Sequence, residues 1–98
     1  MPAQRLQLAQ TALLVVDVQE RLCAAMERDA LERLLARTRA AVEGARALGL
    51  PVLVTEQYPK GLGPTHSALK LHLGEFHPVE KLDFSAAVPE VLAGLGGR

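Results

Sequence analysis

The chain has 98 residues, a length that suits one small domain or part of a larger one. Its 49% hydrophobic content excludes an intrinsically disordered chain, and with 3% aromatic residues the core must be built from Leu, Val and Ala. Eleven basic and eleven acidic residues cancel, which gives no support to nucleic-acid binding, because that function normally needs a basic patch.

The sequence has no feature of a membrane or secreted protein. No apolar run approaches the ~20 residues of a membrane span, and residues 1–5 lead into no signal-peptide core. The one cysteine, Cys23, cannot form an internal disulfide. We therefore expect a cytoplasmic protein with no membrane partner.

The first predicted element is a buried strand at residues 12–17. An unbroken apolar run ends there at a carboxylate, Asp17, and such a run is typical of a parallel strand covered on both faces. Residues 20–28 have a mixed composition, which we interpret as a loop or a short helix.

A long amphipathic helix follows. Asp29 with Glu32 three positions later forms a variant of the capping box, which places the start of the helix at Asp29. Gly49 suits the left-handed residue just past the helix end, and Pro51 prevents continuation. The apolar face recurs at helical spacing and consists of Leu31, Leu34, Leu35, Thr38, Val42, Ala45 and Leu48.

The second predicted strand covers residues 51–55, and a helix between two such strands forms a right-handed βαβ unit. Residues 56–67 are rich in glycine and proline and are predicted to form a loop, and residues 68–76 hold a weak turn of helix. A brief third strand fits residues 79–82.

A short final helix runs from Pro89, a residue favoured at the first helical position, to Leu95, and Gly96 and Gly97 end it. Together the elements predict an α/β fold, a three-layer Rossmann-like parallel sheet with flanking helices. In a doubly wound sheet the first strand is normally central, so three strands leave its second edge unpaired, apolar and open to another chain. We expect residues 1–98 to be the amino-terminal portion of a single domain, truncated after the third strand.

Two charged residues stand at the predicted strand ends, where ligands collect in open α/β sheets. Asp17 is either a carboxylate that caps the following turn or a general base, and composition favours neither. Lys81 is either a solvated surface lysine, the usual outcome, or an inward-facing cation.

Three segments, residues 14–19, 52–65 and 81–85, resemble the isochorismatase-like hydrolases, and above all the isochorismatase domain-containing proteins. The matches cover most of residues 11–95 in the expected order. The resemblance implies an Asp-Lys-Cys triad in which Asp17 deprotonates the thiol and Lys81 stabilises the thiolate. The cysteine would attack a small amide or related acyl substrate, and water would resolve the thioester.

The sequence departs from this family at the nucleophile. The family cysteine follows a fourth strand, and this chain ends where that strand should begin. Cys23 does not match the family position, and we interpret it as a small buried apolar side chain. We therefore expect the 98-residue chain alone to be inactive.

Three further residues are candidates for the substrate pocket. By resemblance Gln19 forms hydrogen bonds in the pocket, with turn capping as an equal alternative. Glu56 and Tyr58 follow the second strand, where the related nicotinamidases carry a metal site, and Tyr58 would line the pocket or a subunit contact. Because no histidine occupies this stretch, we predict no metal. The first βα turn has no glycine, which argues against a dinucleotide site, and we predict no cofactor.

The leading hypothesis is an isochorismatase-family hydrolase with a small-molecule substrate, expected by resemblance to form a homo-oligomer. The alternative is a catalytically inactive scaffold or interaction module that keeps the family fold. The missing nucleophile and the unpaired strand edge motivate that alternative. A small flavodoxin-like ligand-binding domain is disfavoured by the glycine-free first turn.

Overall fold

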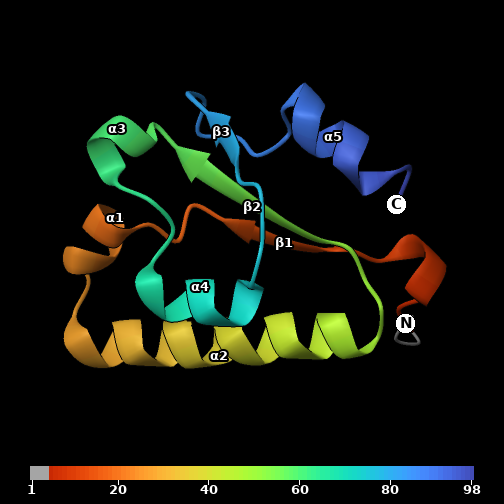
Figure 1. Ribbon diagram of the computed structural model, residues 1–98, viewed down its shortest axis with the longest axis horizontal. Helices are drawn as coiled ribbons and strands as arrows, with labels where there is room; N and C mark the ends of the chain where they lie inside the picture. The colour runs from red at the N-terminus through yellow and green to blue at the C-terminus, as the bar shows by residue number, and fades with distance from the viewer. Residues whose placement is uncertain (1–4) are drawn as a thin grey trace, which may run out of the picture.

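Within residues 5–98, which the computed structural model describes, parallel strands form one sheet in the order β1-β2-β3 (Figure 1). The strands are β1 (Leu13–Val16), β2 (Val52–Gln57) and β3 (Val79–Lys81). Val16 pairs with Thr55 at the end of β1, and Gln57 pairs with Lys81 at the end of β3. The predicted α/β fold with a parallel sheet is confirmed.

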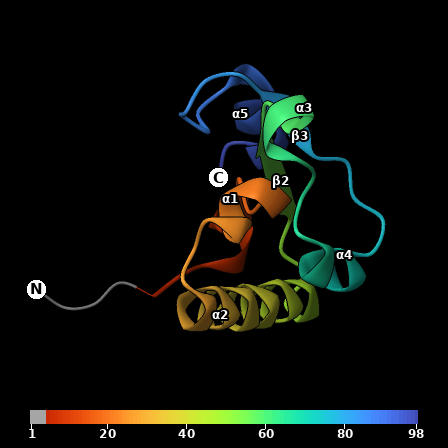
Figure 2. The same cartoon turned by 90° about the vertical axis from the view of Figure 1, so that its left-hand side faces the viewer.

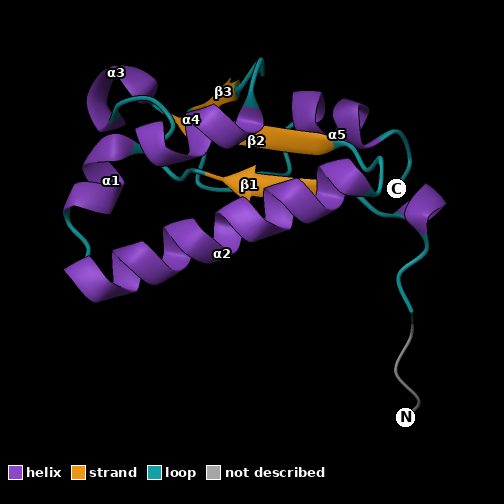
Figure 3. Cartoon of the chain, turned by 60° about the horizontal axis from the view of Figure 1, so that its bottom comes forward, coloured by secondary structure: helices purple, strands orange, loops and turns teal. Residues whose placement is uncertain are grey.

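Helices flank this sheet on both sides. The long helix α2 (Arg28–Ala47) and the shorter α4 (Ser67–Leu73) lie on one side, and α5 (Pro89–Leu95) lies on the other (Figure 2). The short helices α1 (Glu20–Ala24) and α3 (Pro59–Leu62) lie near the carboxyl ends of β1 and β2 (Figure 3). A 3-10 turn, η1 (Leu8–Gln10), precedes β1. Among residues 5–98 no helix combines the length and the apolar character that a membrane crossing requires.

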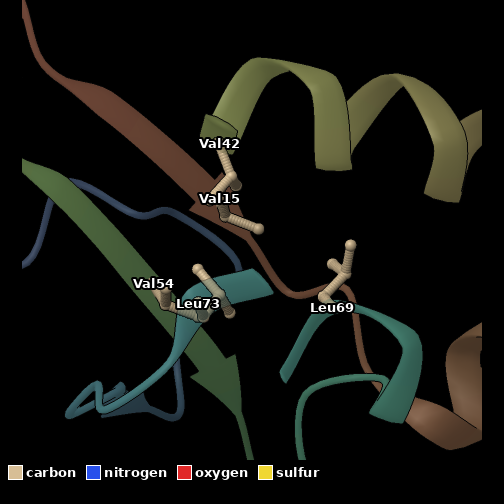
Figure 4. Close-up of a cluster of buried hydrophobic side chains, with 5 residues drawn as sticks. All are labelled: Val15, Val42, Val54, Leu69 and Leu73. Carbon is tan, nitrogen blue, oxygen red and sulfur yellow. The ribbon is translucent and has the colours of Figure 1, made fainter. Parts of the chain in front are cut away.

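The hydrophobic core lies between the sheet and the helices α2 and α4. Its buried side chains are aliphatic, as the composition predicts, and each contributes about 1.5–3 kcal/mol by leaving water. Figure 4 shows them converging from β1, β2, α2 and α4: Val15, Val54, Val42, Leu69 and Leu73. Leu48 was predicted on the apolar helix face, but it is 58% exposed because it lies past the last turn of α2.

The start of α2 differs from the prediction. Glu27 is the N-cap, and its carboxylate accepts hydrogen bonds from the backbone N–H groups of Asp29 and Ala30 at 3.0 and 2.9 Å. These two hydrogen bonds lower the pKa of Glu27. Asp29 lies instead in the first turn, where its negative charge interacts favourably with the helix dipole. The longer Glu side chain reaches both free N–H groups, an arrangement that N-cap preferences for short side chains do not predict.

The remaining boundaries follow the sequence with modest changes. Gly49 has the predicted left-handed conformation, with φ of 72°. The predicted loop at residues 56–67 contains the end of β2 and the helix α3. The weak turn predicted at residues 68–76 is the two-turn helix α4, and α5 has the predicted bounds. On its outer edge β1 pairs with no strand among residues 5–98, and Val16 there is 43% exposed.

Candidate active site

Asp17 and Lys81 meet at the carboxyl end of the sheet. They follow or end the two strands that flank β2, so the parallel order brings both beside the end of the central strand. Lys81 Nζ lies 2.8 Å from Asp17 Oδ2. The lysine side chain is 1% exposed and the aspartate side chain 13% exposed. Lys81 is therefore the inward-facing cation, and the interpretation as a solvated surface lysine is wrong.

The ammonium group of Lys81 is fully hydrogen-bonded. It donates to Asp17 Oδ2 and also to the backbone carbonyls of Asp83 and Phe84, at 2.9 and 3.3 Å. These three acceptors match its three protons and compensate for the water that the buried charge has lost. The same bonds fold the turn after β3 around the charge.

Asp17 is held by the neighbouring strands. Thr55 Oγ1 donates to Asp17 Oδ1 at 2.8 Å, while Lys81 occupies Oδ2. A carboxylate that caps a turn would accept from the backbone N–H groups just after it, and these side-chain partners differ from that arrangement. Asp17 has a φ of 55°, a left-handed conformation that is uncommon for residues other than glycine and concentrates at functional sites.

Gln19 is fully buried and ties two loops together. Its Nε2 donates to the carbonyls of Gln57 and Gly63, at 3.0 and 2.8 Å, and its Oε1 accepts from the Gln57 N–H at 2.7 Å. The amide therefore holds the segment that follows β1 against the loop that follows β2. Its predicted role as a hydrogen-bonding group for substrate stays a prediction.

Glu56 is a buried carboxylate with a structural partner. Both the backbone N–H and the hydroxyl of Thr65 donate to Glu56 Oε2 at 2.7 Å. Because side chains alternate along a strand, Glu56 points to the face of β2 opposite Thr55 and therefore away from Asp17. The contact closes the loop at residues 58–64, and a pocket role for Glu56 stays a prediction.

Tyr58 lies in the wall of a cavity of about 330 Å³, together with Pro59, Lys60, Glu80, Lys81 and Leu82. The lining includes Lys81 but not Asp17, so the cavity adjoins the ion pair rather than enclosing it. The half-exposed tyrosine ring covers Gly61, where any Cβ would collide with it. This position is compatible with the predicted pocket or subunit contact, which stays a prediction.

Cys23 is buried in α1 and is a poor nucleophile where it stands. Burial, and then the negative charge of Glu20, raise the pKa of its thiol, so it stays protonated at neutral pH. This confirms its interpretation as a small buried side chain. Within residues 5–98 no three His, Cys, Asp or Glu side chains gather as ligands for a metal ion.

Thr55 and the two carbonyls that bind Lys81 are not predicted from the sequence. Thr55 is an ordinary β-branched residue at a strand end, and only its pairing with Val16 brings it beside Asp17. Every residue has a backbone carbonyl, so the sequence does not indicate which carbonyls accept hydrogen bonds from Lys81. The strand register, once predicted, could have identified Thr55.

Comparisons with known proteins identify the family of this chain. The isochorismatase domain matches residues 11–95, which is most of the chain. The chain belongs to the isochorismatase domain family. The predicted resemblance is therefore confirmed for the family and its fold.

Relatives of this family member come from several animals. Isochorismatase domain-containing protein 1 of Danio rerio is 48% identical over 54 residues, which are 55% of this chain and 19% of that protein. Isochorismatase domain-containing protein 2A of Mus musculus is 48% identical over the same length, which is 25% of that protein. A solved structure of the MAR1 ribonuclease from Caenorhabditis elegans is 35% identical with a TM-score of 0.83, covering 96% of this chain and 48% of that one. The chain thus spans about half the length of that structure.

Proposed function

We propose that this protein is a hydrolase of the isochorismatase family that acts on a small amide or related acyl substrate. In the proposal Asp17 and Lys81 are two members of an Asp-Lys-Cys triad, and the cysteine comes from outside these 98 residues. The observation that supports it most is the 2.8 Å contact between the buried Lys81 ammonium and the Asp17 carboxylate at the carboxyl end of the sheet. Family membership supports the same chemistry.

In the proposed reaction Asp17 accepts the thiol proton as the thiolate attacks the substrate carbonyl carbon. The tetrahedral intermediate collapses to a thioester, and Asp17 returns the proton to the departing amine. Asp17 then takes a proton from water as the hydroxide attacks the thioester, and the released thiolate regains that proton. Lys81 keeps the carboxylate in place through both half-reactions, because its other two protons are anchored on backbone carbonyls.

The test is hydrolysis by the full-length protein of a panel of small amides and of p-nitrophenyl acetate. Asp17→Asn should lower kcat by about 10²–10⁴-fold, the usual contribution of a general base. Lys81→Met should also lower it, whereas Lys70→Met, the same change on an exposed lysine of α4, should not. Wild-type turnover by Asp17→Asn would refute the proposal.

The ribonuclease name of the structural neighbour adds a second substrate class, phosphodiesters. The 35% identity to that protein favours including a single-stranded RNA oligonucleotide in the panel. Cleavage of the oligonucleotide that Asp17→Asn abolishes would assign it to the same site. The balanced charge of the chain gives no independent support for this class.

An inactive scaffold or interaction module is the alternative function. It is favoured by the outer edge of β1, where a groove is lined mainly by apolar residues such as Leu13, Leu14 and Leu34, together with Arg37 and Thr38. A strand edge of this kind pairs readily with another chain. If the protein is such a module, we expect it to form an oligomer even in dilute solution. We also expect Asp17→Asn to leave its biological function unchanged. A monodisperse monomer by light scattering would count against both the module and the proposed homo-oligomer.

A further inference from the structure

Thr55 contacts Asp17 twice. Its hydroxyl donates to Asp17 Oδ1 at 2.8 Å, and its backbone carbonyl accepts from the Asp17 N–H at 3.2 Å. Thr55 is fully buried and is paired with Val16, so the register of β1 against β2 fixes its position. With the Lys81 contact on Oδ2, Asp17 is held at three points.

Asp17 depends on such support because of its backbone. A residue other than glycine with φ of 55° persists where the surrounding structure over-determines it. The Thr55 carbonyl fixes the main chain of Asp17, and the Thr55 hydroxyl fixes the orientation of its carboxylate. The 13% of the side chain that stays exposed leaves part of Asp17 accessible to a reacting atom.

The hydroxyl contact is separate from the ion pair, because Thr55 donates to Oδ1 and Lys81 donates to Oδ2. Among residues 5–98 the cation in salt-bridge contact with Asp17 is Lys81 of β3, and this contact does not involve Thr55. Removal of the hydroxyl alone therefore changes one of the two stabilising contacts and leaves the other.

We propose that Thr55 is a positioning residue, whose hydroxyl holds the Asp17 carboxylate in the orientation that the reaction requires. The proposal rests on the hydrolase function proposed above. A merely structural role would be to fill space at the end of β2. Valine has the same shape as threonine and would fill that space equally well, so Thr55→Val separates the two roles.

The experiment uses the full-length protein labelled with ¹³C in its aspartate carboxyl groups. NMR records the Asp17 carboxyl carbon at about pH 7, and Asp17→Asn assigns the signal. In Thr55→Val the chemical shift of this carbon should change, because Asp17 Oδ1 loses its hydrogen-bond donor. With p-nitrophenyl acetate as probe, kcat should fall about tenfold while KM changes little. Thr55→Ser, which keeps the hydroxyl, should restore both values.

Matched controls keep the outcomes separate. Thr11→Val makes the same change before the amino end of β1, at the opposite end of that strand from Asp17, and should alter neither value. An unchanged chemical shift of the Asp17 carboxyl carbon, or an unchanged kcat, in Thr55→Val would overturn the positioning role. If Thr55→Val does not fold, Thr55→Ala removes the same hydroxyl and the same two results decide. Absence of hydrolysis by the wild-type protein would refute the hydrolase function instead, while the chemical shift of the Asp17 carboxyl carbon would still test the Thr55 contact.

Discussion

Replacing Lys81 with methionine would leave the Asp17 carboxylate without its cation. Methionine keeps the length and apolar stem of lysine, so the change removes mainly the charge. Loss of one partner of a buried ion pair costs about 3–5 kcal/mol, and the 13% exposure of Asp17 places the expected loss near the lower limit, about 3 kcal/mol. That is a large fraction of the about 5–15 kcal/mol that stabilises a typical domain.

The loss can be measured by urea unfolding of the full-length protein, followed by circular dichroism. A double-mutant cycle with Asp17→Asn isolates the pair, because the double variant leaves no unpaired charge behind. We expect the double variant to be more stable than Lys81→Met, with a coupling of about 2 kcal/mol or more between the two sites. Lys70→Met should change stability by less than about 0.5 kcal/mol. Strictly additive effects of the two substitutions would refute the assignment of a buried, energetically coupled pair.

Three further predictions concern Thr65, Cys23 and Glu27. Thr65→Val removes the hydroxyl that donates to the buried Glu56, and it should destabilise the protein by about 1–3 kcal/mol and speed amide hydrogen exchange in the loop at residues 58–64. Amide hydrogen exchange in that loop at the wild-type rate would contradict the role of the Glu56–Thr65 contact in closing it. Cys23, whose pKa is raised by burial and by Glu20, should react with iodoacetamide at pH 7 more slowly than an exposed peptide thiol, and fast labelling by mass spectrometry would show that α1 opens. Because its folded-state pKa is lowered, Glu27 should contribute stability above its ordinary value of 4.5 and lose it as pH falls through the lowered value. The free energy of unfolding of Glu27→Ala should therefore be lower than that of the wild-type protein near pH 7, and the difference should shrink in acid. A difference that stays constant with pH would argue against the cap.

The outline of the fold is predictable because its signals are local. Apolar runs mark β1 and β2, helical spacing of apolar residues marks α2, and glycine or proline marks where the helices end. One error occurs where two side chains compete for the same backbone groups, because Glu27 caps α2 in place of Asp29. The other occurs at the end of α2, where Leu48 lies past the last turn.

The candidate site was predicted as a set of residues but not as an arrangement. Asp17 and Lys81 follow from the family resemblance, and the strand order explains why they meet. A pocket role for Gln19 and Glu56 stays a prediction, and the hydrogen bonds that they form in the structure are to backbone and to Thr65 in the loop after β2. That loop follows a path that no local pattern in the sequence specifies.

The sequence by itself therefore determined the elements, their order and the two charged residues of the site, because these depend on neighbours along the chain and on motifs. Only the tertiary structure decided that Lys81 is buried with all its protons bonded and that Thr55 holds Asp17. Thr55 and Asp17 are 38 residues apart in sequence, and Asp17 and Lys81 are 64 apart. Such contacts depend on strand register and on the close packing of one sheet, which are set when the whole chain folds.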